Sequence, residues 1–231
     1  MLFEGGQGLG KILKAGLPAE FIYSFAIIVC SLMIYFGTKE IYQLSSHKGI
    51  KYFRQAFLFF AFAYFFRSFL KVIIIYFNFH GIIQICPRFI IGSVLLFLFL
   101  YFGSMAVFYL LYSVLWKKLS HYTLYLFHLI AFMIAIFSVL LDNPLVYLGV
   151  NIILFVFILV SVYILYKESR GKGKKKLNLC TIYFLLLFFW LLNIIDILIP
   201  SILQSFQIFI YIISLGIFLL ILYKVLKKVG S

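Results

Sequence analysis

The chain has 231 residues, of which 66% are hydrophobic and only 11% are charged. So few charges cannot cover the surface of a water-soluble domain of this length, so the composition excludes a soluble protein and indicates a membrane protein. The formal net charge of +14 would suit nucleic-acid binding, but most of the basic residues stand in clusters between hydrophobic runs or at the C-terminus, which excludes that class.

The first 17 residues are rich in glycine and carry Lys11 and Lys14. Their apolar stretch is too broken for the core of a signal peptide, and no small-residue cleavage site follows it. We therefore expect residues 1–17 to form a short tail on the outer side of the membrane.

Six uncharged hydrophobic runs follow along the chain, each close to or above the ~20 residues that cross ~30 Å of hydrocarbon. A further run, 53–77, is interrupted by Arg67 and Lys71, so its crossing of the membrane needs a separate argument. The six uncharged runs are residues 21–38, 89–116, 119–141, 143–166, 177–195 and 197–223.

The basic residues decide whether the interrupted run crosses the membrane. Fifteen of the 20 Lys and Arg residues lie within the segments 39–54, 117–118, 167–176 and 224–228, the pattern of cytoplasmic segments. An even number of crossings must separate the first two segments if both are cytoplasmic. Residues 89–116 supply one crossing, so residues 53–77 must supply the other.

These counts predict an all-α integral membrane protein, a single seven-helix bundle over residues 18–228. The N-terminus is expected outside and the C-terminus in the cytoplasm, as in a multi-pass protein of the cell membrane. Pro18, Pro87 and Pro144 fall at predicted outer starts of helices and Pro200 at an outer end, where proline is tolerated. The expected helices span residues 18–40, 50–77, 86–116, 119–141, 144–166, 177–200 and 202–226.

The second predicted helix carries Tyr64, Arg67 and Lys71 on one face. At 1.5 Å per residue, Arg67 lies roughly 25 Å from the cytoplasmic end of that helix, and therefore inside the bilayer. A charge there costs at least ~2.5 kcal/mol and marks a functional site, although a structural ion pair would also explain it. We predict that Arg67 pairs with Asp196, the one acid clearly inside a predicted span, and that this pair forms the floor of an outer pocket.

Further polar residues point to the same outer half of the bundle. Asn193 lies one turn below Asp196, and Glu20 lies at a similar depth near the outer start of the first helix. Interhelical hydrogen bonds would explain each polar residue singly. Their convergence from several helices predicts a ligand-binding pocket open to the outside. The predicted pocket residues are Tyr64, Arg67, Lys71, Asn193, Asp196, Gln204, Gln207 and Tyr211.

Several chemistries are not indicated. Cys30, Cys86 and Cys180 have no metal-like or redox-like spacing, so we expect no disulfide and no zinc site. His128 has no second intramembrane histidine on another helix, so we expect a hydrogen-bonded bundle residue rather than a haem ligand. Nucleophile, metalloprotease and phosphate-loop motifs are absent, which predicts no enzyme and no cofactor. The arrangement resembles rhodopsins in topology only, and the last helix has no lysine before Lys224 to bind retinal.

The expected partners lie on the membrane and on its cytoplasmic side. The basic segments would attract anionic lipid, at ~1 kcal/mol per basic residue near the surface. Segments 37–54 and 167–176 are either docking sites for a cytoplasmic protein or simply a solvated turn and a topological anchor. No nucleic-acid partner is expected, and the oligomeric state is left open.

The leading functional hypothesis is a receptor-like, ligand-sensing module that acts through its cytoplasmic loops. A small transporter or channel subunit is the alternative. The absence of internal repeats and of proline-broken helices argues against this alternative. A structural subunit of a larger membrane complex is the second alternative.

Overall fold

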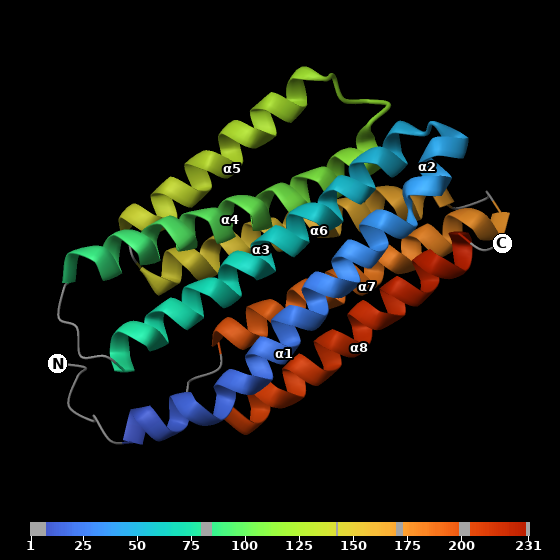
Figure 1. The fold of residues 1–231 in the computed structure, drawn as a ribbon. Coiled ribbons are helices and arrows are strands. Elements are labelled where there is room, and N and C mark those ends of the chain that lie inside the picture. The colour runs from blue at the N-terminus through green and yellow to red at the C-terminus, as the bar shows by residue number, and fades with distance from the viewer. Residues whose placement is uncertain (1–7, 80–84, 142, 170–172, 199–203, 230–231) are drawn as a thin grey trace.

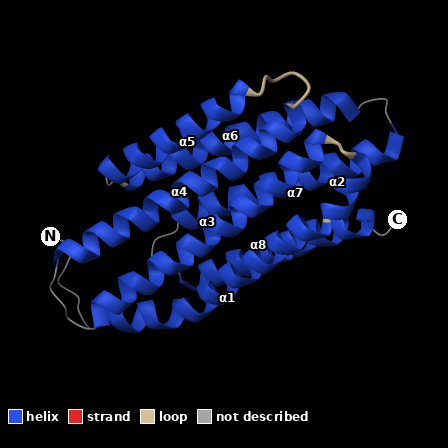
Figure 2. Ribbon diagram, turned by 45° about the horizontal axis from the view of Figure 1, so that its top comes forward, coloured by secondary structure: helices blue, strands red, loops and turns tan. Residues whose placement is uncertain are grey.

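The computed structural model describes residues 8–79, 85–141, 143–169, 173–198 and 204–229. Over these residues the chain forms eight helices and no strand, so the predicted all-α fold is confirmed for them (Figures 1 and 2). The helices are α1 (Gly8–Gly37), α2 (Lys39–Ser45), α3 (Lys48–Phe79), α4 (Ile85–Leu115), α5 (Tyr122–Leu141), α6 (Pro144–Ser169), α7 (Gly173–Leu198) and α8 (Gln204–Val229).

The long helices run side by side in one bundle, and successive long helices run in opposite directions (Figure 1). Short α2 lies at one end of this bundle, which is the predicted cytoplasmic end. The opposite end, where α1, α4, α6 and α8 begin, is the predicted outer end, and the two ends are called cytoplasmic and outer after this prediction. Closest packing occurs between α3 and α4, whereas α5 packs on α4 and hardly touches α6.

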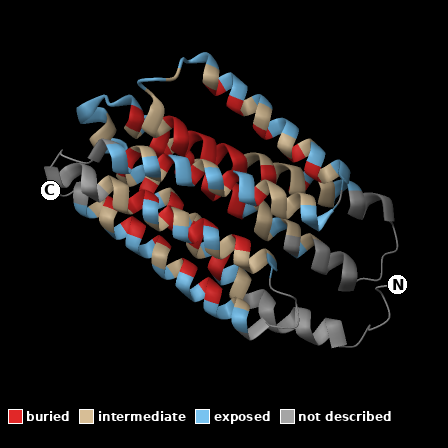
Figure 3. Ribbon diagram, turned by 180° about the vertical axis from the view of Figure 1, so that it is seen from behind, coloured by how far each residue is buried: buried red, intermediate tan, exposed pale blue. Residues whose placement is uncertain are grey.

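Six segments of the described chain are long and apolar enough to cross a membrane. Buried residues gather where the helices meet, while large apolar side chains such as Leu129, Leu140 and Phe209 are exposed on the outside (Figure 3). Water would not favour such a surface, but lipid does. The chain is therefore a multi-pass helical membrane protein. The six segments are Ala19–Ser45, Ile90–Leu115, Tyr122–Leu141, Pro144–Lys167, Leu179–Leu198 and Phe206–Lys227.

Helix α3 is less apolar than these six because five basic residues interrupt it. It nevertheless lies inside the bundle, between α1 and α4, and one face of it is buried along Phe57, Phe60 and Tyr64. Its 32 residues make it the longest of the described helices. At about 1.5 Å per residue α3 is roughly 48 Å long.

Four phenylalanine rings close the middle of the bundle. Phe57 and Phe60 on α3 meet Phe189 on α7 and Phe218 on α8, and each is at most 1% exposed. Neighbouring ring centroids lie 5.0 Å (Phe189–Phe218) to 6.4 Å (Phe60–Phe189) apart, a normal spacing for packed aromatic rings. These four side chains form the aromatic layer.

Two helix boundaries differ from the sequence prediction. Helix α1 begins at Gly8, so Pro18 lies inside it rather than at its start. Leu13, Lys14 and Ala15 just before it have good helix propensity, and the helix continues through Pro18 although proline removes one backbone hydrogen bond. The first predicted helix ended at residue 40, whereas α1 ends at Gly37 and residues 39–45 form the separate short helix α2.

The other prolines agree with the expected boundaries where the structure describes them. Pro87 is the third residue of α4, and Pro144 is the first residue of α6. Both positions lie in a first helical turn, whose backbone N–H groups have no intrahelical partner. Pro200 lies outside the described residues.

Glycine at position 49 allows α3 to approach α4 closely. Gly49 is buried at the start of α3, and a Cβ atom there would lie 2.9 Å from the backbone oxygen of Ser113 on α4. A methyl group at that distance would require one of the two backbones to move. The cytoplasmic ends of α3 and α4 are therefore packed backbone to backbone.

We expect Gly49→Ala to lower the midpoint of thermal unfolding in detergent by several degrees, because overpacking at this contact costs about 1–3 kcal/mol. Gly216→Ala on α8 is the matched control, since a Cβ atom there meets nothing within 4 Å. The control should be neutral or slightly stabilising, because alanine favours helix over glycine by ~1 kcal/mol. Equal midpoints for the two variants would contradict the close α3–α4 contact.

Candidate functional site

Three helices each bring two polar side chains, spaced three residues apart, to the outer half of the bundle. This spacing puts both members of a pair on one helical face, about one turn apart. In each pair one residue is charged and lies nearer the outer end, and the other is an uncharged hydrogen-bonding residue one turn deeper. The six residues form the outer cluster: Glu20 and Tyr23 on α1, Tyr64 and Arg67 on α3, and Asn193 and Asp196 on α7.

The charged layer of the outer cluster is centred on Arg67. Its Nη2 atom lies 3.1 Å from Oδ2 of Asp196 and 3.4 Å from Oε1 of Glu20. The predicted pair of Arg67 with Asp196 is therefore confirmed, and Glu20 is a second carboxylate that the prediction did not include. All three side chains are only 11–14% exposed, so the ion pairs are shielded from solvent. Oδ1 of Asp196 is buried and has no hydrogen-bond partner among the described atoms.

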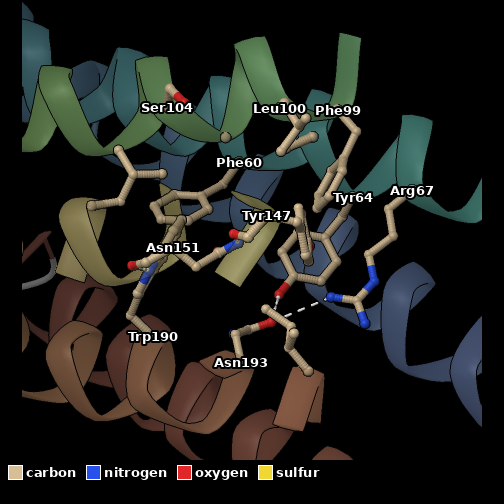
Figure 4. Close-up of a pocket in the computed structure, with 14 residues that line it drawn as sticks. Phe60, Tyr64, Arg67, Phe99, Leu100, Ser104, Tyr147, Asn151, Trp190 and Asn193 are labelled. Atoms are coloured by element: carbon tan, nitrogen blue, oxygen red, sulfur yellow. Dashed lines mark hydrogen bonds between the residues drawn. The ribbon is translucent and has the colours of Figure 1, made fainter. Parts of the chain in front are cut away.

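The uncharged layer lies one turn deeper and is tied to the charged one through Asn193 (Figure 4). The Tyr64 hydroxyl donates to Oδ1 of Asn193 at 2.9 Å, and Nη1 of Arg67 donates to the same oxygen at 3.3 Å. Because the Tyr64 proton is used there, the Tyr23 hydroxyl, 3.2 Å away, donates to the Tyr64 oxygen. Nδ2 of Asn193 donates to the carbonyl of Phe189, which fixes the orientation of the amide.

The predicted residues on α8 take less part in this network. The ring of Tyr211 stacks on that of Tyr23, with centroids 4.7 Å apart and an interplanar angle of 13°. Gln207 is half-buried and lines neither of the cavities described next. The side chains of Lys71 and Gln204, which were also predicted in the pocket, lie outside the described part of the structure.

An open cavity of about 420 Å³ lies beside the outer cluster, among the outer parts of α3 to α7. Arg67 borders this outer cavity, together with Tyr147 on α6 and Ile197 on α7. The rest of the wall is mainly apolar, with Ser138 and Asn143 as further polar residues. A volume of this size falls in the range of about 300–1,000 Å³ that is usual for small-molecule pockets.

A second, smaller cavity of about 60 Å³ lies deeper in the bundle (Figure 4). Its wall includes Tyr64, Asn193, Asn151 and Ser104, and it reaches down to Phe60 of the aromatic layer. We call it the inner cavity. Five residues line both cavities, so the cavities adjoin there, and we call this boundary the passage: Arg67, Phe99, Leu100, Tyr147 and Ile197.

The part of these cavities that α4 and α6 contribute was not predicted from the sequence. On α6, Tyr147 and Asn151 are spaced four residues apart, and the Asn151 side chain donates to the Tyr147 carbonyl at 2.9 Å. The indole N–H of Trp190 on α7 donates to the carbonyl of Asn151 at 3.1 Å. The spacing of Tyr147 and Asn151 in an otherwise apolar helix was the signal that could have marked this face.

A third pocket, of about 140 Å³, lies at the cytoplasmic end. Thr38, His47, Gly49 and Phe53 contribute to its wall, so it lies on the predicted docking segment 37–54. The wall is mostly apolar. Of the second predicted segment, 167–176, residues 170–172 lie outside the described ranges.

His128 and two of the three cysteines can also be located. Nδ1 of His128 lies 2.8 Å from the hydroxyl of Tyr101, and Nε2 lies 3.3 Å from that of Tyr109, so the prediction of a hydrogen-bonded bundle histidine is confirmed. Cys30 and Cys180 are free thiols. The side chain of Cys86 lies outside the described part of the structure.

The chain is similar to an uncharacterized protein of Archaeoglobus fulgidus. The two are 31% identical over 218 residues, which is 92% of this chain and 93% of the archaeal one. The similarity thus spans nearly the whole of both chains. No protein-family model matches the sequence, and no solved structure matches it.

We expect Arg67→Met to destabilise the protein more than Asp196→Asn, because it leaves two carboxylates without their shared cation. Asp196→Asn leaves Arg67 with Glu20. The double variant should lose less free energy of unfolding than the sum of the two single losses, with a coupling of about 1–3 kcal/mol. The reason is that Asp196→Asn removes a buried carboxylate that Arg67→Met has left without its cation. Thermal unfolding in lipid nanodiscs measures this cycle.

Lys51→Met is the matched control for that cycle, because Lys51 is an exposed cation on the same helix. Its effect should be within about 0.5 kcal/mol of zero. Strictly additive losses at positions 67 and 196 would contradict the ion pair.

Proposed function

The chain belongs to the same family as the Archaeoglobus fulgidus protein, and we propose that it is a receptor-like membrane protein that binds a small ligand at its outer end. In this proposal seven helices cross the cell membrane, with the N-terminus outside and the C-terminus in the cytoplasm. The ligand lies in the outer cavity, against Arg67.

The crossing of α3 is the step that makes the count seven. At about 48 Å this helix exceeds the ~30 Å thickness of the hydrocarbon core. Arg67, the charge that most opposes insertion, lies beside two carboxylates, which lowers the cost of burying it. With seven spans, the described basic residues Lys39, Lys51, Lys117 and Lys227 all fall on the cytoplasmic side.

The observation that carries the proposal is the position of the outer cavity directly beside the outer cluster. A mainly apolar wall with a few polar groups at one end is the usual construction of a small-molecule site. Arg67 borders the cavity and at the same time contacts α1 and α7. A ligand that touches Arg67 would therefore act on the arrangement of three helices.

The response would be transmitted through α3 to the cytoplasmic end. Helix α3 begins at Lys48, beside the cytoplasmic pocket, and its first turn packs backbone to backbone on α4 at Gly49. A cytoplasmic protein docking on segment 37–54 would sense movement of that turn. Anionic lipid would bind the neighbouring basic residues. The proposed role is ligand binding, not catalysis.

A small transporter is the second candidate, and the order of the cavities along α3 favours it. The inner cavity ends at Phe60, whereas the cytoplasmic pocket ends at Phe53. Seven residues of helix, roughly 10 Å at 1.5 Å per residue, lie between them. The aromatic layer fills that interval, as a closed gate would. Flux across proteoliposome membranes would favour transport, and its absence would favour sensing.

We expect single cysteines, introduced into a variant without the three native ones, to report the proposed topology. A membrane-impermeant maleimide added to intact cells should label position 145, at the start of α6, and should not label position 118, after α4. Lysed cells should show labelling at both positions. Labelling of position 118 in intact cells would contradict the N-outside, seven-span arrangement.

We expect native mass spectrometry of the protein released directly from its membranes to detect one bound small molecule. Leu96→Trp should abolish binding, because Leu96 lines the outer cavity and the larger ring fills part of it. Val94→Trp, on an exposed face of the same helix, is the matched control and should retain the bound mass. A wild-type protein without any bound mass would contradict the ligand-binding proposal.

A further inference from the structure

The outer and inner cavities differ in chemical character although they meet at one passage. Arg67 and Tyr147 lie at that passage and line both cavities. A molecule that fills both would experience an apolar environment on one side of the passage and a polar one on the other. The ligand class follows from this contrast.

The outer cavity offers little to a polar ligand apart from Arg67 and Tyr147. Its other polar side chains, Ser138 and Asn143, each make one local hydrogen bond: the Ser138 hydroxyl donates to the carbonyl of Ile134, and Oδ1 of Asn143 accepts from the backbone N–H of Leu145. The remaining wall is made of leucine, isoleucine, phenylalanine and proline side chains. An apolar body fits this space.

The inner cavity is lined by hydrogen-bonding groups that are not all used. Asn151 lines the cavity, and its Nδ2 donates to the carbonyl of Tyr147, whereas no hydrogen bond to its Oδ1 is seen among the described residues. Buried polar groups in proteins nearly always have a partner, so a donor in the cavity is the natural partner of this oxygen. A volume of about 60 Å³ corresponds to two water molecules at ~30 Å³ each, or to a head group of two or three atoms.

The charges around the passage exclude a charged head group. An anionic head would bring a third negative charge close to the carboxylates of Glu20 and Asp196. A cationic head would have to pass Arg67. The guanidinium group has five N–H donors, and three hydrogen bonds from it are seen, so donors remain for a neutral acceptor.

We propose that the two cavities together bind an amphipathic molecule, with its apolar body in the outer cavity and a small uncharged hydroxyl or carbonyl head in the inner cavity. This inference rests on the proposed ligand-binding function and names the class of its ligand. The wall of the outer cavity includes residues of α5 and α6, two helices that hardly touch each other. In this proposal, a molecule dissolved in the outer leaflet enters the cavity between these two helices.

The test uses four probes that share a ten-carbon chain: 1-decanol, decanoate, decylammonium and decane. Trp190 lines the inner cavity, and Trp116→Phe leaves it as the single tryptophan of the chain. Its fluorescence in nanodiscs reports occupancy of the inner cavity. Decanol should change the emission saturably, at a half-saturating concentration at least tenfold below those of decanoate and decylammonium, and decane should have no effect.

Asn151→Val should raise the half-saturating concentration of decanol about fivefold, the effect of one lost hydrogen bond. Ser161→Val, on the same helix and outside both cavity walls, is the matched control and should leave it unchanged. Tighter binding of either charged probe, binding of decane equal to that of decanol, or equal effects of the two valine variants would overturn the inference.

The failure of this inference can be distinguished from failure of the proposed function. If decanol does not bind but the wild type carries a bound mass that Leu96→Trp removes, the outer cavity is a ligand site of another class and the inference is overturned. If the wild type carries no bound mass and no probe changes the emission of Trp190, the proposed function and the inference are both overturned.

Discussion

A charged arginine in the outer half of the bundle imposes the main constraint on this structure. A guanidinium group stays protonated in proteins, and an unpaired charge in hydrocarbon is costly, so anionic partners must reach it from other helices. Asp196 on α7 and Glu20 on α1 both meet the Nη2 atom of Arg67. These contacts consequently fix the outer ends of α1, α3 and α7 relative to one another along the bundle axis. Asn193 reinforces this arrangement one turn deeper by accepting hydrogen bonds from Tyr64 and Arg67.

The same arginine connects the helix arrangement to the cavities. Arg67 borders both the outer and the inner cavity, so a molecule in either one contacts the group that ties three helices together. A ligand shifts a conformational equilibrium only by its difference in affinity for the two states. Contact with Arg67 gives a ligand a direct means of achieving such a difference. The aromatic layer below the inner cavity then decides between the two proposed roles, because it either stays closed and transmits movement or opens and passes a solute.

The sequence was sufficient to pair Arg67 with Asp196, because a buried charge demands an opposite one and a single acid lay clearly inside a predicted span. Glu20 was placed at a similar depth but was not paired with Arg67, for a physical reason. With the first helix expected to start at residue 18, Glu20 stood at the membrane edge, whereas α1 begins at Gly8 and places Glu20 well inside a helix. An uncharged residue such as Tyr147 can be buried without an oppositely charged partner. Its place at the passage could therefore not be predicted from the sequence.

The cavities could not be predicted for a related reason. They depend on where side chains from several helices fail to fill space, and the apolar runs of α4 and α6 hold no pattern that specifies such gaps. The approximate positions of the seven long helices were easier to predict, because length, hydropathy and basic clusters act on each segment separately. The structure differs most from the prediction where a helix extends through glycine and proline, as α1 does before residue 18.

The central claim is that Arg67 holds the outer ends of α1 and α7 in one arrangement. Electron–electron double resonance between spin labels at Ile22→Cys and Leu198→Cys, both exposed positions, measures that arrangement in a variant lacking the native cysteines. In nanodiscs the protein with Arg67 intact should give one narrow distance distribution, and adding Arg67→Met should broaden it or shift it to longer distances. Identical narrow distributions with and without Arg67 would contradict the claim.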